Sequence, residues 1–175
     1  MMLECGCPGD YPDWHERDID LGGQAVHRLP IPTLLHMPLA YEAYVQKQRQ
    51  ALEHLQLAER WPGLRLTRTG IFRGSLTCLI EDGQSMSRHV SHLPHPFHVR
   101  GYLHQGNVST SRNAIRHVQM TLLDSGRIPK ELYLCHLTCP HCSERRGGDK
   151  ILLLRRWQGS EKLEKKLEQR SAARG

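Results

Sequence analysis

Five of the six cysteines in this chain of 175 residues lie in two tight groups at opposite ends of the sequence. One group is Cys5-Gly6-Cys7, and the other contains Cys135, Cys139 and Cys142. Thiols one or two residues apart can point their sulfurs at a common centre, as a tetrahedral Zn²⁺ site requires. If both groups bind one ion, the fold must bring the N-terminus against the C-terminal third of the chain.

The strongest metal site that this pattern predicts is a structural zinc bound by four thiolates. Gly6 can absorb a tight turn between the first two ligands, and Cys-Pro-His-Cys has the compact spacing of a zinc knuckle. The predicted ligands are Cys5, Cys7, Cys139 and Cys142, with Cys135, His136 and His141 as substitutes. Reduced thiols without a metal are the simpler alternative. Cys78 lies in an apolar segment and is expected to be a core thiol.

Two catalytic interpretations of the second group compete with the structural zinc. The spacing of Cys135, Cys139 and Cys142 resembles the radical SAM iron-sulfur motif, but that motif begins a large barrel, and only 33 residues (175 − 142) follow here. Cys139 to Cys142 also resembles the dithiol of DsbA-type oxidoreductases, which needs a helix N-terminus at its first cysteine. Gly147-Gly148 interrupts any such helix. A thiol redox or metal-dependent enzyme therefore remains an alternative, and the sequence leaves open whether the chain is an enzyme.

Hydropathy and charge indicate where the protein is located and which partners it could bind. No apolar run approaches the ~20 residues of a membrane helix, and the first ten residues lack the charged and apolar regions of a secretory signal. We therefore expect a cytoplasmic protein, where thiols stay reduced and clustered cysteines more often bind metal. The formal charge is +6, and no arginine-aromatic interleaving typical of single-strand binders is visible. Nucleic-acid binding is not favoured, although the basic tail could meet an acidic partner.

Hydrophobic periodicity predicts an α+β domain made of two β-α-β-β repeats. The first repeat (about 24–81) reads as a strand, a helix ending near Arg60, and strands over 64–72 and 76–80. The second (97–157) reads as a strand over 97–104, a helix over 111–125, and strands over 131–138 and 151–157. We expect an N-terminal arm over 1–23, a His- and Pro-rich linker over 82–96, and a charged helix or tail over 158–175. The two repeats together predict one antiparallel sheet with two main helices.

This order of elements resembles the gyrase-inhibitor-like, or effector-binding, family. The resemblance is carried by a strand ending in His104-Gln105-Gly106 ahead of a helix that ends in Asp124-Ser125-Gly126. It implies tandem β-α-β-β repeats related by a pseudo-twofold axis, a fold similar to SOUL-type haem-binding domains, and a small ligand in the cleft between repeats. This chain departs from the family at His36-Met37-Pro38, where a glycine is expected, and in its terminal cysteine groups.

The expected ligand pocket combines this resemblance with the residue pattern. Glu131 stands near the position of the family's pocket glutamate at the start of a strand. Alternation along the strand places His98, Arg100 and His104 on one face, where they could form a polar wall. The predicted small-molecule site is therefore Glu131, Arg100, His98 and His104, although a solvated sheet face explains the last three equally well.

Four histidines, His89, His92, His95 and His98, recur at three-residue spacing around Pro94 and Pro96. The prolines exclude a helix and favour polyproline II, where neighbouring rings would lie roughly 9 Å apart. A shared metal ion would then require a bend. We therefore expect a polar, pH-sensitive linker here.

Overall fold

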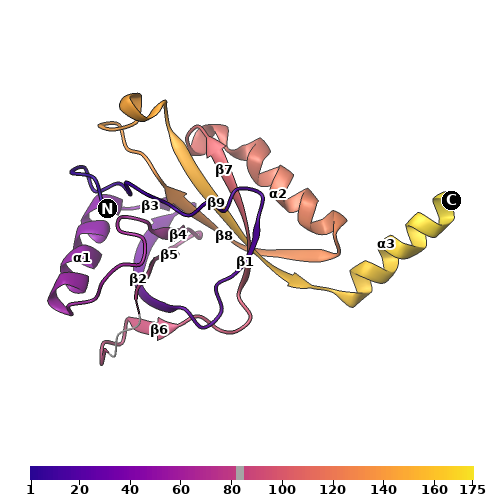
Figure 1. The fold of residues 1–175 in the computed structure, drawn as a ribbon, viewed down its shortest axis with the longest axis horizontal. Coiled ribbons are helices and arrows are strands. Elements are labelled where there is room, and N and C mark those ends of the chain that lie inside the picture. Colours follow the sequence, from indigo (N-terminus) through magenta and orange to yellow (C-terminus); the bar gives the residue numbers. More distant parts are fainter. Residues whose placement is uncertain (82–84) are drawn as a thin grey trace.

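The computed structural model describes residues 1–81 and 85–175, and within them the chain forms one sheet and three α-helices (Figure 1). The first repeat contains β2 (Ala25–Leu34), α1 (Tyr41–His54), β4 (Leu66–Arg68) and β5 (Arg73–Leu79). The second contains β7 (His98–Gln105), α2 (Arg112–Asp124), β8 (Arg127–His136) and β9 (Lys150–Gly159). The remaining elements are β1 (Asp18–Asp20), β3 (Met37–Pro38), β6 (Val90–His92), the 3₁₀ turns η1 (Val108–Thr110) and η2 (Glu144–Arg146), and the terminal helix α3 (Glu161–Arg174).

The order of strands confirms the predicted α+β class and its repeated architecture. The sheet runs β1-β7-β9-β8-β4-β5-β2-β3, with β6 added to β2, and the pairs are antiparallel. Each repeat contributes the same trio, with its last strand in the middle: β7-β9-β8 on one side and β4-β5-β2 on the other. The two trios meet where Thr67 of β4 pairs with Leu134 of β8. A pseudo-twofold axis therefore passes between β4 and β8.

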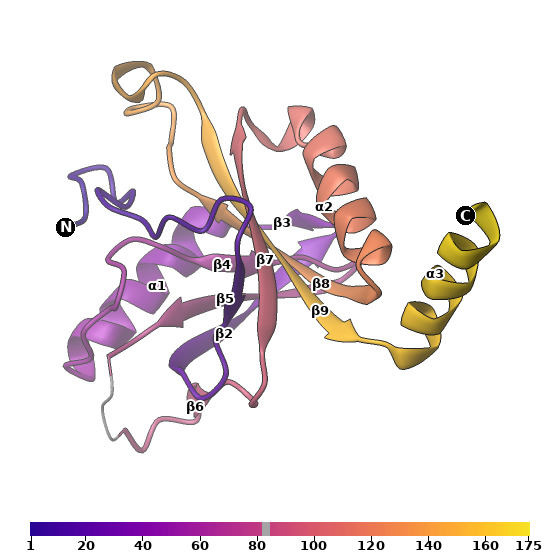
Figure 2. The same ribbon diagram turned by 45° about the vertical axis from the view of Figure 1, so that its right-hand side comes forward.

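Both main helices cover the same face of this sheet (Figure 2). On β2 the odd-numbered residues Leu29 and Ile31 pack with Leu76 beneath Tyr44 and Val45 of α1. In the second repeat, the cluster under α2 includes Ala114, Ile151, Leu153 and Leu134. Since Leu134 pairs with Thr67 across the repeat boundary, and the Tyr41 hydroxyl of α1 lies 3.3 Å from Thr67 Oγ1, the two helices flank that boundary on one side.

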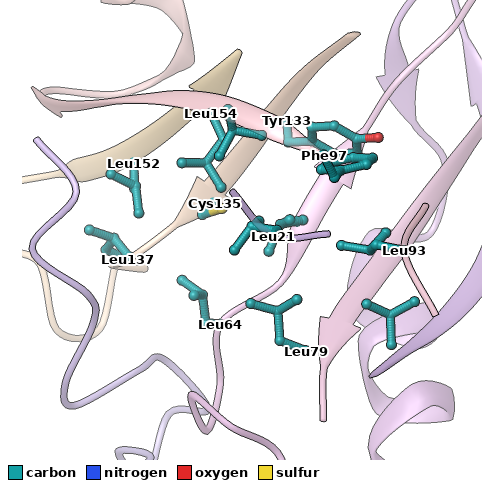
Figure 3. Close-up of a cluster of buried hydrophobic side chains, with 13 residues drawn as sticks. Leu21, Leu64, Leu79, Leu93, Phe97, Tyr133, Cys135, Leu137, Leu152 and Leu154 are labelled. Carbon is teal, nitrogen blue, oxygen red and sulfur yellow. The ribbon is translucent and has the colours of Figure 1, made fainter. Parts of the chain in front are cut away.

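The largest buried cluster lies on the opposite face and is closed by residues of the arm and of connecting loops (Figure 3). Its strand residues include Val26, Val99, Tyr133, Cys135, Leu152 and Leu154. Loop residues complete it, with Leu21, Leu64 and Leu93 all at most 4% exposed. Burying a leucine of this kind is worth ~2 kcal/mol, so the arm and the connecting loops contribute to the core as well as to the surface.

Helix α1 ends earlier than its pattern predicts. We expected it to continue to about Arg60, but it stops at His54, with Leu55 as its C-cap. Gln56 takes a left-handed backbone (φ 54°), and the N–H of Leu57 returns to the carbonyl of Leu52 at 2.9 Å. Leu57 then packs beside Leu52 and Ile80. Burial of Leu57 in this turn is therefore more favourable than one further turn of helix.

The prolines of β2 lie where the strand has one paired neighbour. Pro30 and Pro32 pair with β5 on one side, while β6 pairs only with 25–27 and β3 only with 33–34. Proline has no N–H to donate to a second neighbour, so this part of the strand tolerates it. The β4–β5 turn lies between Arg68 and Arg73, so the strand expected over 64–72 ends earlier and the one expected over 76–80 begins earlier.

The predicted His- and Pro-rich linker contains the three-residue strand β6. Its first residues, 82–84, lie outside the described residues. The four histidines of the three-residue repeat are dispersed: the ring of His89 lies 5.7 Å from that of His27, His95 contacts Asp20 at 3.6 Å, and His98 stacks on Trp157 at 4.5 Å. Where the chain is described, no helix is both long enough and apolar enough to span a membrane.

Candidate metal centre

Four thiols from the two ends of the chain meet at one point. The sulfurs of Cys5, Cys7, Cys139 and Cys142 all lie within 4.8 Å of one another, and none of these cysteines forms a disulfide. Cys5 is exposed, Cys7 and Cys139 are half-buried, and Cys142 is buried. The arm before the first repeat thus meets the loop that joins the last two strands of the second, as the spacing required.

The N-terminal half of the cluster is a tight turn that packs closely against Gly63. The N–H of Gly6 donates to the carbonyl of Leu3, and the N–H of Leu3 donates to the carbonyl of Cys7, both at 2.8 Å. Gly6 takes a positive φ of 86°, which glycine adopts without strain. A Cβ on Gly63 would lie 2.8 Å from the nitrogen of Pro8 and 2.9 Å from the carbonyl oxygen of Gly6. A side chain at residue 63 would therefore displace the cysteine turn.

The C-terminal half of the cluster has the hydrogen bonding of a knuckle. The N–H of Cys139 donates to the sulfur of Cys142 at 3.4 Å. The N–H groups of Cys142 and Ser143 both donate to the carbonyl of Cys139, at 3.1 and 2.9 Å. These bonds hold the sulfurs of Cys139 and Cys142 3.9 Å apart on one side of the turn.

Arg146 joins the two halves directly. Its guanidinium donates to the carbonyl of Leu137 at 2.7 Å and to the carbonyl of Pro8 at 3.0 Å. One residue after Cys7 is thereby tied to the loop that contains Cys139 and Cys142. The sequence pattern did not identify this arginine, because no local motif reports which distant carbonyl a loop arginine will meet.

The thiols influence one another electrostatically. Burial and hydrogen bonds from the three other thiols raise the pKa of Cys7 well above its usual range. Burial opposes ionisation of Cys142 as well, but the N–H of Cys139 and the thiols of Cys7 and Cys5 outweigh it and lower the pKa of Cys142 to about 7. Without a cation the cluster accommodates negative charge on one sulfur at the expense of another. A bound divalent cation would remove that conflict.

The cluster fits zinc. A tetrahedral site with Zn–S bonds of ~2.3 Å separates its sulfurs by about 3.8 Å, and the measured 3.9 Å between Cys139 and Cys142 matches that edge. Four thiols would fill all the positions of a tetrahedral ion and leave none for water or substrate, which is typical of structural sites. The four cysteines could thus hold a metal ion.

The other candidate ligands lie outside the cluster. Cys135 is fully buried in the core on the far face, where burial raises its thiol pKa. His141 is exposed, and its carbonyl accepts from Arg145 at 3.4 Å. His136 lines the cavity beside the cluster. Cys78 is buried beside Leu52 and Ile80, as expected for a core thiol.

The segment after Cys142 is a single 3₁₀ turn, η2, which ends at Gly147 with a left-handed backbone. Cys139 therefore does not begin an α-helix whose dipole would stabilise its thiolate, the arrangement that a DsbA-type dithiol needs. The geometry of this loop favours metal ligation over thiol redox chemistry.

Two cavities flank the metal centre on the helix-covered face. One, of about 260 Å³, is lined by residues of both repeats, including Tyr41, Val45, Arg49, His136 and Cys139. The other, of about 430 Å³, lies on the far side of the segment from His136 to Pro140 and reaches Val108 and Ile151. The rings of Tyr41 and His136 meet edge to face at 5.7 Å. Burial raises the pKa of Tyr41 and lowers that of His136, so both side chains are uncharged at neutral pH.

The four predicted pocket residues lie on two faces of the sheet. His98, Arg100 and His104 share the α2 face of β7, as their alternation predicted, where Arg100 contacts Asp18 at 3.0 Å and His104 contacts Thr110 at 2.9 Å. Glu131 lies in the bulge of β8 between Pro129 and Leu132 and contacts Arg156 at 3.5 Å. Arg156 lies over the ring of Phe97, which belongs to the core of the opposite face. The glutamate is thus separated from the other three by the sheet.

The fold and the cysteine cluster define a two-repeat α+β protein with a candidate metal centre joining its ends. No family model matches the sequence, and no curated protein matches it. Among solved structures, the chain is similar in fold to the C-terminal domain of EcmrR, with a TM-score of 0.59 at 10% identity over 82% of this chain and 96% of that one. EcmrR in a complex with DNA matches with a TM-score of 0.57 at 9% identity, over 82% of this chain and 57% of that one. This likeness concerns the fold alone, and it is consistent with the tandem β-α-β-β arrangement that the sequence predicts.

Proposed function

We propose that this protein is a small-molecule-binding domain whose ends are held together by a structural zinc ion. The observation that carries the proposal is the meeting of four sulfurs, from residues 5, 7, 139 and 142, within 4.8 Å of one another. Zinc bound here would close a loop of more than 130 residues. Because such a site does not exist in the unfolded chain, its binding free energy would add to the free energy of unfolding.

The zinc clasp would shape the cleft between the repeats. Cys5, Cys7 and Cys139 line the smaller cavity together with residues of α1, so the metal centre forms one wall of that cleft. Tyr41 and His136 supply an aromatic wall with polar tips. A pocket with apolar sides and a few fixed polar groups is the usual form of a small-molecule site. Both cavities together would admit a ligand of modest size.

Substitution of a single ligand tests the clasp. Cys7→Ser should lower the melting temperature by several degrees and release zinc, because three thiolates cannot close the tetrahedron. His141→Ala, a change in the same knuckle at an exposed side chain, should leave both quantities unchanged. An unchanged melting temperature in Cys7→Ser would contradict the clasp, and loss of zinc in His141→Ala would assign that histidine to the metal.

A ligand screen by thermal shift, followed by calorimetry, tests the cleft. His136→Ala should weaken binding of a compound found in the screen about tenfold, by loss of one wall and one polar contact. Glu131→Ala is the matched variant on the other face. If Glu131→Ala weakens binding and His136→Ala does not, the ligand lies on the face opposite to the helices and the proposed cleft is wrong.

A further inference from the structure

A third cavity, of about 510 Å³, lies on the sheet face opposite to the helices and far from the thiols in sequence. Strands β2, β4 and β5 of the first repeat form its floor, and the segment leading into β6 forms one rim. The residues used below are Arg28, Arg68, Arg73, Ser75, Arg88 and His89. It shares no lining residue with the cavities beside the metal centre.

The register of the strands explains why arginines gather here. Arg68 of β4 lies directly opposite Ser75 of β5, and Ser75 lies opposite Pro30 of β2. Arg28 and Arg73 are each two residues away from this row, so alternation puts them on the same face, roughly 7 Å along their strands. Ser75 and Pro30 in this row are small and leave a hollow, which the longer arginine side chains surround.

The rim is fixed by backbone pairing. The N–H of Arg28 donates to the carbonyl of His89 at 2.8 Å, and Ser91 pairs with Val26. Arg88 and His89 are therefore held beside the edge of β2. Arg88 and His89 thus line the same hollow as the three arginines of the strands.

The arginines of this groove lack the ion-pair partners that several other arginines of the chain have. Arg28, Arg68, Arg73 and Arg88 are exposed, and none makes an ion pair or a side-chain hydrogen bond with residues 1–81 or 85–175. By contrast, Asp18 contacts both Arg100 (3.0 Å) and Arg127 (2.8 Å). Glu131, an acid on the same face as the groove, is engaged by Arg156 at 3.5 Å. Among the described residues, those that line this cavity include no carboxylate.

We infer that this arginine groove binds a small molecule bearing two or more phosphate groups. Four like charges around one hollow repel one another, and a multiply charged anion converts that repulsion into attraction. The guanidinium fork matches phosphate oxygens in pairs, and Ser75 offers a hydroxyl at the floor. The volume of about 510 Å³ is within the range of small-molecule sites. The groove lies on the opposite face from the proposed cleft, so this binding is independent of that proposal.

Calorimetry of the full chain with pyrophosphate, ADP and adenosine at low and at physiological ionic strength tests the inference. Pyrophosphate and ADP should bind and adenosine should not, and affinity should fall as salt rises. The double variant Arg68→Gln, Arg73→Gln should weaken ADP binding at least about tenfold. The control double variant Arg112→Gln, Arg116→Gln removes the same charge from exposed positions on α2 and should change the affinity less than about twofold. Equal melting temperatures of the two double variants would show that both are folded.

Three results would overturn the inference. Absence of pyrophosphate and ADP binding at low salt would exclude a phosphate site. Equal weakening by the groove variant and the α2 variant would show an effect of net charge alone. Binding of a single-stranded oligonucleotide, with no binding of pyrophosphate or ADP, would assign the arginines to nucleic acid.

Discussion

A single side chain, that of Arg146, connects the two ends of the chain through backbone carbonyls. Its two hydrogen bonds, to the carbonyls of Pro8 and Leu137, join the arm to the knuckle loop. Hydrogen bonds from a charged donor are worth more than neutral ones because the charge strengthens the attraction. Arg146 thus holds the thiols near one another even before a metal ion arrives.

Replacing Arg146 should therefore loosen the metal centre. We expect Arg146→Ala to lower the free energy of unfolding by about 2 kcal/mol and to speed the loss of metal to a chelator. The neighbouring Arg145→Ala is the control, since that exposed side chain makes one long bond, at 3.4 Å, to His141. Urea denaturation and the rate of chelation measure both effects. If the two variants unfold and lose metal alike, Arg146 does not stabilise the metal centre.

A second residue-scale prediction concerns acid. Burial, with smaller effects of His89 and Arg65, lowers the pKa of His27 below 6.5. Below pH 6.5 the unfolded chain takes up a proton at His27 that the folded chain does not, so the free energy of unfolding falls with pH until the folded pKa is reached. His27→Phe should therefore lose up to about 1.4 kcal/mol less than the parent between pH 7.5 and 5.5. Urea titrations at both pH values measure this difference, and parallel losses would contradict it.

At the scale of elements, α1 is fixed to the sheet by the polar side chain of Gln48 as well as by apolar residues. Gln48 is fully buried, and its amide donates to the carbonyls of His27 and Leu76, both at 3.1 Å. These carbonyls belong to β2 and β5, so one side chain sets the position of the helix across two strands. The same helix supplies Tyr41 and Val45 to the cleft.

Truncation of this residue should consequently destabilise the first repeat. We expect Gln48→Ala to lower the free energy of unfolding by at least about 2 kcal/mol, through lost hydrogen bonds and an unfilled space. Gln50→Ala, on the exposed side of the same helix, should change it by less than about 0.5 kcal/mol. Equal effects at the two positions would show that the helix is positioned by its apolar residues alone.

The elements of the two repeats could be predicted because their signals are local. Periodic apolar residues identify α2 and β7, and Gly126, with φ of 77°, ends α2 as expected. The strands β1 and β6 have three residues each and exist through pairing with distant strands, so no local pattern predicts them. The early end of α1 likewise depends on the burial of Leu57 against residues far along the chain.

The candidate site was predictable to different degrees. The four thiols could be grouped because their spacing carries the chemistry of zinc ligation. The pocket role of Glu131 was inferred from the family resemblance alone, and the structure places this residue with Arg156 on the face opposite to His98. The arginine groove could not be predicted from the sequence either. Its residues Arg28, Arg68 and Arg73 come from three strands, and only the register of these strands brings them together.

At the scale of the whole molecule, the proposed metal centre, cleft and arginine groove lie in separate regions. The sheet places two repeats about a pseudo-twofold axis, and the helices flank a cleft on one face. The four thiols bring the arm, ahead of the first repeat, together with the last hairpin of the second. The arginine groove belongs to the other face and to the first repeat alone.

We propose above all that the four thiols bind one structural zinc ion. The most direct test is the metal content, together with the number of reactive thiols, of protein purified without chelator. We predict one zinc per chain, with Cys5, Cys7, Cys139 and Cys142 protected from alkylation in the folded protein and reactive after chelation. Protein that contains no metal, and whose Cys139 and Cys142 exchange readily between dithiol and disulfide, would contradict the claim and favour a thiol redox protein.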